Sequence, residues 1–137
     1  MDIRTLHHVS LPASDLERSK KFYREILRLR EIDRPPFDFA GAWFQVSETQ
    51  QLHLIVCADP TFRGAKSINS RDVHFAVRVT SYREALEFLR SKGYREDADS
   101  MDLKRMNVNL KAVAGFPQIF ILDPDRHVIE INADRLD

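Results

Sequence analysis

The clearest pattern in the chain is an alternation of apolar and other side chains over residues 72–79. Successive side chains of a β-strand point to opposite faces, so this segment predicts a strand with two different faces. One face is apolar and carries Val73, Phe75, Val77 and Val79. The other face is mixed and carries His74, Ala76 and Arg78. The apolar face is expected in a core. The mixed face carries an imidazole and a guanidinium. This combination is unusual for a sheet face that is fully buried and also for one that is fully exposed to solvent.

A similar arrangement stands at the start of the chain, where residues 3–11 are expected to form a strand. His8 lies on one face of this segment, and Val9 and Leu11 lie on the other. Apolar residues at helical spacing then predict a helix over 15–28. The two halves of the chain therefore begin in the same way, with a strand that leads into an amphipathic helix.

The starts of both helices carry the same signal. Ser14 is followed three residues later by Glu17, and Ser81 is followed in the same way by Glu84. This spacing is typical of a capping box, so both serines are predicted to be N-caps. Gly93 is expected at the C-terminal end of the second helix.

Shorter apolar segments complete each half, and they predict strands over 30–33, 42–47, 51–57, 118–122 and 127–132. Each half then has one strand, one helix and about three further strands that end in a hairpin. The fold class is α+β, with two βαβββ modules, and a doubly wound parallel sheet is disfavoured because helices and strands do not alternate regularly. The expected organisation is a single domain over 1–137, with module 1–58 and module 72–137 joined by linker 59–71.

Composition and charge exclude several kinds of partner. The chain has 137 residues, with 21 Lys plus Arg and 21 Asp plus Glu, so its formal net charge is zero. A neutral chain gives no electrostatic reason to expect nucleic acid or a membrane surface as a partner. The single cysteine rules out an intrachain disulfide, and the N-terminus lacks the layout of a secretion signal. A cytoplasmic location is therefore expected.

Four side chains of the kind that bind metals occupy equivalent places in the two modules. His8 and His74 lie on the mixed face of each first strand, and His53 and Glu130 lie on each last strand. Pairing the modules about a pseudo-two-fold axis would bring the four together, and three imidazoles with one carboxylate suit a divalent transition metal. The alternative is a solvated outer sheet face, but Glu130 stands between two isoleucines, where an unpaired buried carboxylate is costly. His7 is expected to point away from His8.

The segments described above resemble the vicinal oxygen chelate superfamily, which includes glyoxalase I, fosfomycin-resistance enzymes, extradiol dioxygenases and bleomycin-binding proteins. The resemblance covers nearly the whole chain and is carried by residues 6–11, 14–17, 21–23, 73–75 and 122–130. It implies that the βαβββ modules form a cup-shaped, incomplete barrel around a metal ion. It also implies that His8, His74 and Glu130 are the recurring ligands and that His53 is the fourth, at a position that is usually Glu in glyoxalase I.

The resemblance implies a metal-dependent lyase or isomerase similar to glyoxalase I, a lactoylglutathione lyase, acting on a small molecule with adjacent oxygen atoms. The divalent metal, which would be Zn, Ni, Co, Mn or Fe, would polarise these oxygens. Glu130 is then the expected catalytic proton carrier. The alternatives are an extradiol-type dioxygenase, and a transferase or binding protein similar to those that confer fosfomycin or bleomycin resistance.

Other side chains have smaller expected roles. Arg78 would either bind an anionic group of the substrate or form a surface salt bridge. Cys57 lies on the His53 face, where it either lines the site or is simply buried, and Trp43 is expected in the core. Arg126 stands where the resembled Asp-Pro-Asp turn usually continues with glycine, and a left-handed conformation there would cost an arginine roughly 1 kcal/mol.

The oligomeric state is predicted from the module organisation. One module alone cannot close a cup, and small members of the resembled superfamily usually build each site from the first module of one chain and the second module of another. A homodimer is therefore expected, with metal sites between subunits. His8 and His53 of one subunit would meet the equivalents of His74 and Glu130 supplied by the other.

Overall fold

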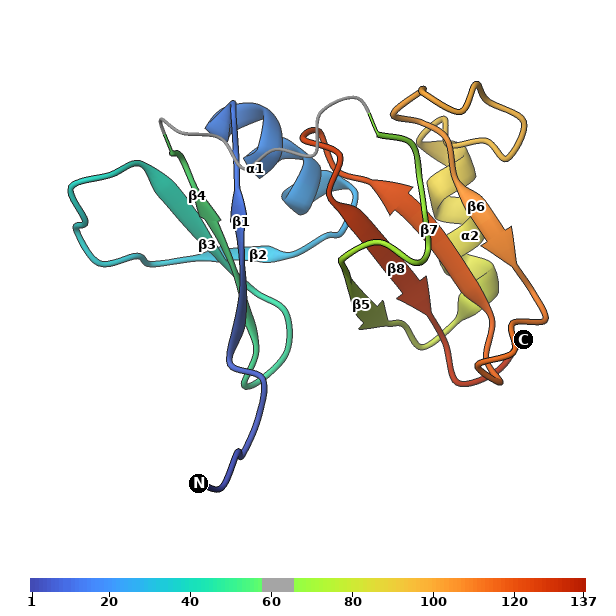
Figure 1. Cartoon of the computed structure of the whole chain (residues 1–137), viewed down its shortest axis with the longest axis horizontal. Helices are drawn as coiled ribbons and strands as arrows, with labels where there is room; N and C mark the ends of the chain where they lie inside the picture. The colour runs from blue at the N-terminus through green and yellow to red at the C-terminus, as the bar shows by residue number, and fades with distance from the viewer. Residues whose placement is uncertain (58–65) are drawn as a thin grey trace. The chain divides into compact units, whose positions relative to one another are not determined.

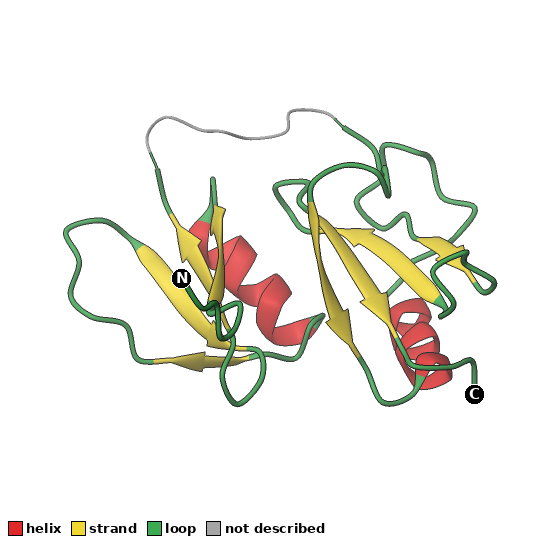
Figure 2. Cartoon of the chain, turned by 60° about the horizontal axis from the view of Figure 1, so that its bottom comes forward, coloured by secondary structure: helices red, strands yellow, loops and turns green. Residues whose placement is uncertain are grey.

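The computed structural model describes residues 1–57 and 66–137, and these fall into two compact units, Met1–Phe62 and Arg63–Asp137 (Figure 1). Unit 1 contains β1 (His8–Pro12), α1 (Leu16–Glu25), β2 (Arg30–Ile32), β3 (Gly41–Gln45) and β4 (Gln51–Ile55). Unit 2 contains β5 (His74–Arg78), α2 (Tyr82–Ser91), β6 (Asn107–Asn109), β7 (Gln118–Leu122) and β8 (Val128–Asn132). Figure 2 shows one helix and one sheet in each unit. The predicted α+β class and the βαβββ order in both halves are confirmed. Residues 58–65, which include positions 59–65 of the predicted linker, lie outside the described residues.

Each unit contains one four-stranded mixed sheet, and the two sheets have corresponding strand orders, β1-β4-β3-β2 and β5-β8-β7-β6. In each sheet the first and last strands of the unit run parallel, and the other neighbours run antiparallel. The register pairs Ser10 with His53 and Ala76 with Glu130. The topology therefore places the first and last strands of each unit side by side, which brings the two candidate ligands of that unit to one sheet face.

The opposite face of each sheet forms the core. In unit 1, Phe22 and Tyr23 of α1 are buried together with Phe44 and two leucines of β4. In unit 2 the corresponding face carries the buried isoleucines of β7 and β8, and the hydroxyl of Tyr82 ties α2 to β7 by donating to the Gln118 carbonyl oxygen at 3.1 Å. The amphipathic helices therefore cover one face of each sheet. The other face carries the candidate ligands, and in unit 2 it also buries a cluster of Phe120, Leu122 and Val128, against which Ile68 and Leu103 pack.

One of the two helices begins at the predicted N-cap and the other does not. Ser81 is the N-cap of α2, and its hydroxyl accepts from the backbone N–H of Glu84 at 3.1 Å, as predicted. The N-cap of α1 is Asp15 and not Ser14, because the Asp15 carboxylate accepts from the backbone N–H of Arg18 at 3.0 Å. The Ser14 hydroxyl instead accepts from the Arg18 guanidinium. Ser14 and Asp15 are adjacent and are both of a residue type that favours the N-cap position. The sequence pattern does not show which of the two takes it.

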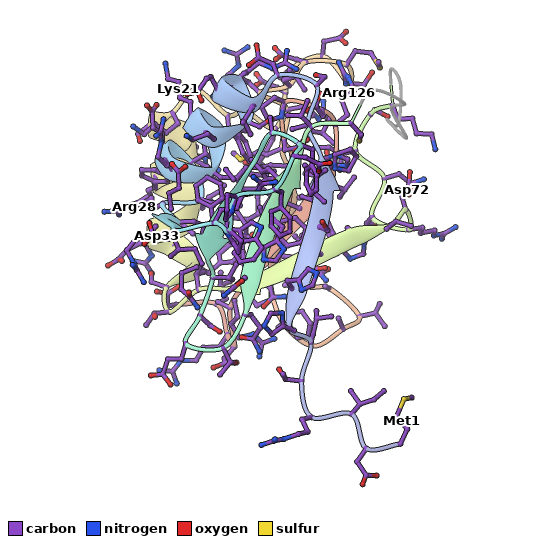
Figure 3. All side chains as sticks on the ribbon, turned by 90° about the vertical axis from the view of Figure 1, so that its left-hand side faces the viewer. Met1, Lys21, Arg28, Asp33, Asp72 and Arg126 are labelled. Carbon is purple, nitrogen blue, oxygen red and sulfur yellow. The ribbon has the colours of Figure 1, made fainter. Side chains whose placement is uncertain are left out.

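Element boundaries also differ from the predictions. The first strand begins at His8 and not at residue 3, and α1 ends at Glu25, after which Arg28 (Figure 3) takes a positive φ of 55°. Val73, predicted on a core face, lies outside β5 and is 87% exposed. The alternation at 72–79 therefore extends two residues before the hydrogen-bonded strand and one residue after it.

Two positions with positive φ end their elements. Gly93, at φ 87°, follows the C-cap of α2 as predicted. Arg126 (Figure 3) has φ 67°, and its guanidinium donates to the Lys66 carbonyl oxygen at 3.1 Å and the Met101 carbonyl oxygen at 2.8 Å. The expected left-handed conformation is present, and the side chain makes contacts that offset its strain. Among the described residues, no helix has the length and apolar character needed to cross a membrane.

Candidate functional site

The best-defined pair of candidate ligands lies in unit 2, where His74 on β5 and Glu130 on β8 share a sheet face. The Nε2 atom of His74 lies 3.4 Å from Oε2 of Glu130. The Glu130 residue is only 5% exposed. A carboxylate this buried needs a partner, because an unpaired buried charge is strongly unfavourable. The structure therefore brings together the two residues that the sequence pattern had placed in the second module.

The orientation of the His74 ring is fixed by the backbone just before β5. The Nδ1 atom of His74 lies 2.8 Å from the carbonyl oxygen of Asp72. A carbonyl oxygen only accepts hydrogen bonds, so Nδ1 carries the proton and Nε2 presents its lone pair in the neutral ring. Two acceptor atoms, Nε2 and the Glu130 oxygen, then face one another. Such a pair needs a proton or a cation between the two atoms.

The Glu130 carboxylate has a second partner that separates the roles of its oxygens. Its Oε1 atom accepts a hydrogen bond from Nδ2 of Asn132 at 2.7 Å. Asn132 is itself buried, and its Oδ1 atom accepts from Nε of Arg78 at 2.8 Å. One carboxylate oxygen is therefore anchored, and the other faces His74. This is the outer support expected around a metal-binding carboxylate and imidazole.

The pair in unit 1 has a different geometry. The rings of His8 and His53 stack with centroids 4.3 Å apart and planes 15° apart. The lone pairs of an imidazole lie in the ring plane, so those of two stacked rings run side by side and do not converge on one point. A metal that takes both nitrogens needs the exposed His8 ring to leave this stack.

His53 is held on both faces and at one edge. Its second face stacks on Trp43, with centroids 4.1 Å apart and planes 6° apart. Its Nε2 atom lies 2.9 Å from the side-chain carbonyl oxygen of Gln51, which accepts a hydrogen bond and leaves Nδ1 with the lone pair. Burial lowers the pKa of His53, and the neighbouring positive charge of protonated His8 lowers this pKa further. The neutral form, which is the form that binds metals, is thus favoured.

His7 and Trp43 do not lie as predicted in unit 1, and the buried alternative for Cys57 is wrong. His7 does not point away from His8, because their Nδ1 atoms lie 2.9 Å apart; His7 precedes β1, so strand alternation does not apply to it. Trp43 is half-buried on the His53 face and is not part of the core. Cys57 is exposed and lies beyond the end of β4.

Arg78 takes the salt-bridge alternative in unit 2. Its guanidinium contacts the Asp134 carboxylate and lies over the Phe116 ring, with Cζ 4.9 Å from the ring centroid. The Arg78–Asp134 ion pair remains largely exposed to solvent. This arrangement supports Asn132 and, through it, Glu130, and a contact between Arg78 and substrate stays a prediction.

Each unit taken alone holds half of the predicted ligand set. Within residues 1–57 and 66–137, neither unit gathers three histidine, cysteine, aspartate or glutamate side chains that could hold a metal ion. The joining of the His8–His53 pair with the His74–Glu130 pair stays a prediction. The supporting residues Gln51 and Asn132 were not predicted from the sequence. The available signal was their spacing, because each stands two positions from a candidate ligand and shares its strand face.

Comparisons with known proteins agree with this architecture. The profile of the Glyoxalase/Bleomycin resistance protein/Dioxygenase superfamily matches residues 5–131. A curated protein of Arabidopsis thaliana, "Glyoxylase I 4", is 29% identical over 139 residues, which cover 99% of this chain and 75% of that protein. A putative glyoxalase family protein of Bacillus anthracis has a similar structure, with a TM-score of 0.75, 19% identity and 98% of each chain covered.

A further similar structure contains a metal ion. It is a variant of the fosfomycin resistance protein FosX from Listeria monocytogenes, complexed with Mn(II) and 1S,2S-dihydroxypropylphosphonic acid. The match has a TM-score of 0.70 and 18% identity, and it covers 98% of this chain and 95% of that one. At such identities, the similarity of the solved structures shows the fold alone.

Proposed function

The chain belongs to the Glyoxalase/Bleomycin resistance protein/Dioxygenase superfamily, and we propose that it is a metal-dependent lyase or isomerase similar to glyoxalase I. Its substrate is a small molecule with adjacent oxygen atoms. The observation that carries this proposal is the His74–Glu130 pair, in which Nε2 of the imidazole faces a buried carboxylate oxygen at 3.4 Å. The name of the Arabidopsis thaliana relative supports the glyoxalase assignment over other members of the superfamily.

The donor set fits a divalent transition metal. His8, His53 and His74 supply imidazole nitrogens and Glu130 supplies carboxylate oxygen, a combination suited to Zn, Ni, Co, Mn or Fe and poorly suited to Mg or Ca. Bound there, the metal would act as a Lewis acid toward the two adjacent oxygens of the substrate. The Mn(II) in the FosX variant is consistent with this metal class.

The Glu130 side chain can carry the proton that the reaction moves. Asn132 holds Oε1, so the carboxylate keeps its position while Oε2 gains or loses its partner. A carboxylate that is anchored at one oxygen and free at the other is suited to general acid–base catalysis at adjacent carbons. His74 remains oriented throughout by the Asp72 carbonyl oxygen.

Other activities of the superfamily receive less support. A dioxygenase needs open metal positions, and a fourth protein ligand at His53 would leave fewer of them. A fosfomycin-type transferase would need a cation for its phosphonate on the sheet face that carries His74 and Glu130. The cation predicted for such a role, Arg78, is paired with Asp134.

We further propose that the protein is a homodimer whose metal sites lie between subunits, with His8 and His53 from one chain and the other two ligands from its partner. The separation of the ligands into two half sets, one in each unit, supports this arrangement. Zero net charge offers no opposition to association.

The metal assignment is tested through Trp43, the single tryptophan of the chain. Trp43 stacks on His53, so Co²⁺ or Ni²⁺ bound at His53 is expected to quench its fluorescence. The His74→Ala variant removes a ligand from the other unit and should abolish quenching at metal concentrations that saturate the parent. Unchanged quenching in this variant would show that the two half sets do not share a metal. Turnover of methylglyoxal with glutathione by the metal-loaded parent then tests the activity.

The shared site is tested by mixing two inactive variants, His8→Ala and His74→Ala, after unfolding and refolding them together. A site built from two chains gives mixed dimers with one intact site and one doubly damaged site. Statistical pairing then restores up to about a quarter of the sites. Zero metal recovery in verified mixed dimers would overturn the shared-site proposal and leave the four ligands untouched.

A further inference from the structure

Three aromatic rings lie next to the candidate ligands of unit 1, on β3 and on the loop that precedes it. Phe37 and Phe39 stack with centroids 5.1 Å apart and planes 24° apart, and Phe37 lies 6.0 Å from Trp43. Trp43 in turn stacks on His53 at 4.1 Å. We call Phe37, Phe39 and Trp43 the aromatic platform. The platform reaches a candidate metal ligand through an unbroken series of ring contacts.

A guanidinium is fixed against this platform. The Cζ atom of Arg34 lies 4.6 Å from the centroid of Phe37 and 4.8 Å from that of Phe39, and its Nη2 donates to the Phe39 carbonyl oxygen at 2.8 Å. Gly41 leaves room for the Arg34 side chain, because a Cβ atom there would lie 3.2 Å from Nε of Arg34 and would also clash with the backbone of Leu54. The cation is therefore positioned by backbone, rings and a glycine together.

The loop that carries Phe37 and Phe39 is restricted by two prolines, and unit 1 does not cover the platform. Pro35 and Pro36 restrict the loop, and the backbone N–H of Phe37 donates to the Pro35 carbonyl oxygen at 2.8 Å. Phe37 remains 45% exposed and Phe39 40% exposed. In the described part of the chain, no carboxylate forms an ion pair with Arg34. Two exposed phenyl rings and an unneutralised cation thus stand side by side.

We propose that the aromatic platform is a subsite for an aromatic anion: a planar aryl group lies against Phe37 and Trp43, and its acidic substituent faces Arg34. Resting on the proposed function, this names the substrate class as an aryl compound that carries adjacent oxygens and a negative charge. The aryl group occupies the platform, and the oxygens reach toward His53.

The chemistry of the platform favours this occupant over an aliphatic one. Aromatic pairs gain from ring geometry beyond the apolar area that they bury, and a flexible alkyl group gains only from the area. The guanidinium of Arg34 has five N–H donors, and within residues 1–57 and 66–137 one of them donates a hydrogen bond, so others are available for a carboxylate. The platform is continuous with His53. A small molecule that extends from the metal ligands therefore fits it better than a partner protein that would cover the loop.

The subsite is tested in protein treated with chelator, so the result does not depend on the metal. Benzoate and cyclohexanecarboxylate are the probes, because they share charge and approximate size but only benzoate is planar. Benzoate is expected to bind more tightly, by about 2- to 12-fold, as measured by equilibrium dialysis and by the emission of Trp43. Phe37→Leu and Arg34→Gln should each weaken benzoate binding, and Phe39→Tyr, which keeps the ring, should retain it.

Phe88→Leu is the matched control, because it removes a phenyl ring that also lies beneath a cation, Lys92, but in unit 2. Equal binding of the two probes, no benzoate binding at all, or the same loss in Phe88→Leu as in Phe37→Leu would each overturn the subsite. A change of oligomeric state in Phe37→Leu without any change in benzoate binding would assign the platform to a protein contact and also overturn it. Benzoate binding retained in His74→Ala, together with lost metal binding, separates this proposal from the metal assignment.

Discussion

The two units repeat one backbone arrangement and use it for different chemistry. In unit 2, His74 and Glu130 meet edge to edge, and each is held by a polar neighbour, Asp72 or Asn132. In unit 1, His8 and His53 occupy the corresponding strands and stack face to face. The same strand order therefore fixes which residues are adjacent, while the side chains around them decide which atoms meet.

The difference indicates how the two half sets would contribute to a metal site. The unit 2 pair already opposes a lone pair to a carboxylate oxygen and has its outer hydrogen bonds in place, so it needs little rearrangement. The unit 1 pair lies in an aromatic stack, and the exposed His8 ring must turn before both imidazoles face one ion. We therefore expect unit 2 to dominate metal affinity and unit 1 to adjust to it.

The largest expected effect is the loss of a unit 2 ligand. Glu130→Ala should weaken Co²⁺ binding by more than about 100-fold, since removal of a ligand should exceed the 10- to 100-fold effect of losing its outer support. His8→Ala should weaken binding less, because its ring must first leave a stack. Competition with a chromogenic chelator measures both, and Glu48→Gln, which alters an exposed carboxylate in a turn of unit 1, is the control. A greater loss in His8→Ala than in Glu130→Ala would reverse the comparison.

The outer residues should show the same asymmetry on a smaller scale. Asn132→Ala removes the anchor of Glu130 Oε1 and is expected to weaken metal binding by about 10- to 100-fold. Gln51→Ala frees one edge of His53, but the ring remains between His8 and Trp43, so a loss of only a few-fold is expected. The same chelator competition distinguishes the two. Equal losses would show that stacking does not restrain His53.

The first residues of the two helices offer a third comparison. The helix α2 begins with Tyr82, whose hydroxyl donates a hydrogen bond to β7. The corresponding first residue of α1 is Leu16, which has no hydroxyl. Tyr82→Phe should lower the free energy of unfolding by about 1–2 kcal/mol at pH 7. Burial raises the pKa of Tyr82 to about 12 from 10.0, so the stabilising phenol is fully present below pH 10.

This stability is lost as the pH rises from 10 through about 12, because the folded state resists ionisation and the unfolded state does not. Burial also raises the pKa of Tyr94, which acts in the same direction. Urea midpoints at pH 7, 10 and 11.5 should therefore fall less for Tyr82→Phe than for the parent. Identical alkaline declines in both proteins would rule out Tyr82 as a contributor.

The smallest effects are expected at the helix caps. Asp15→Ala in unit 1 and Ser81→Ala in unit 2 should each cost ~1 kcal/mol of stability, because each side chain accepts from a backbone N–H of the first turn. Ser14→Ala should cost less than about 0.5 kcal/mol, because Asp15 and not Ser14 accepts from the backbone N–H of Arg18, and the Ser14 hydroxyl accepts from the exposed Arg18 guanidinium. Urea unfolding, monitored by circular dichroism, measures the change in the free energy of unfolding for all three variants. A larger loss for Ser14 than for Asp15 would contradict the assignment of the cap.

The sequence was sufficient where periodicity alone decides the outcome. Alternation and helical spacing predicted both βαβββ units and placed His74 and Glu130 on corresponding strands, and the structure brings these two into contact. Periodicity carries no information on the torsion angles of a side chain. It therefore did not predict that His53 stacks between His8 and Trp43, nor that Asn132 anchors Glu130. Strand alternation also fails outside a strand, which is why His7 was predicted to point the wrong way.

The turn at Arg126 has a consequence for protein engineering. Glycine is the usual stabilising replacement at a position with φ 67°, because it removes the strain on the backbone. Here the replacement would also remove a side chain that reaches backbone carbonyl oxygens 60 and 25 positions away, at Lys66 and Met101. Replacing Arg126 with the glycine that is common in such turns would relax the backbone at one residue. It would also remove the hydrogen bonds that connect the turn to the segments at Lys66 and Met101. At this position the unusual residue is the better choice for a thermostable variant.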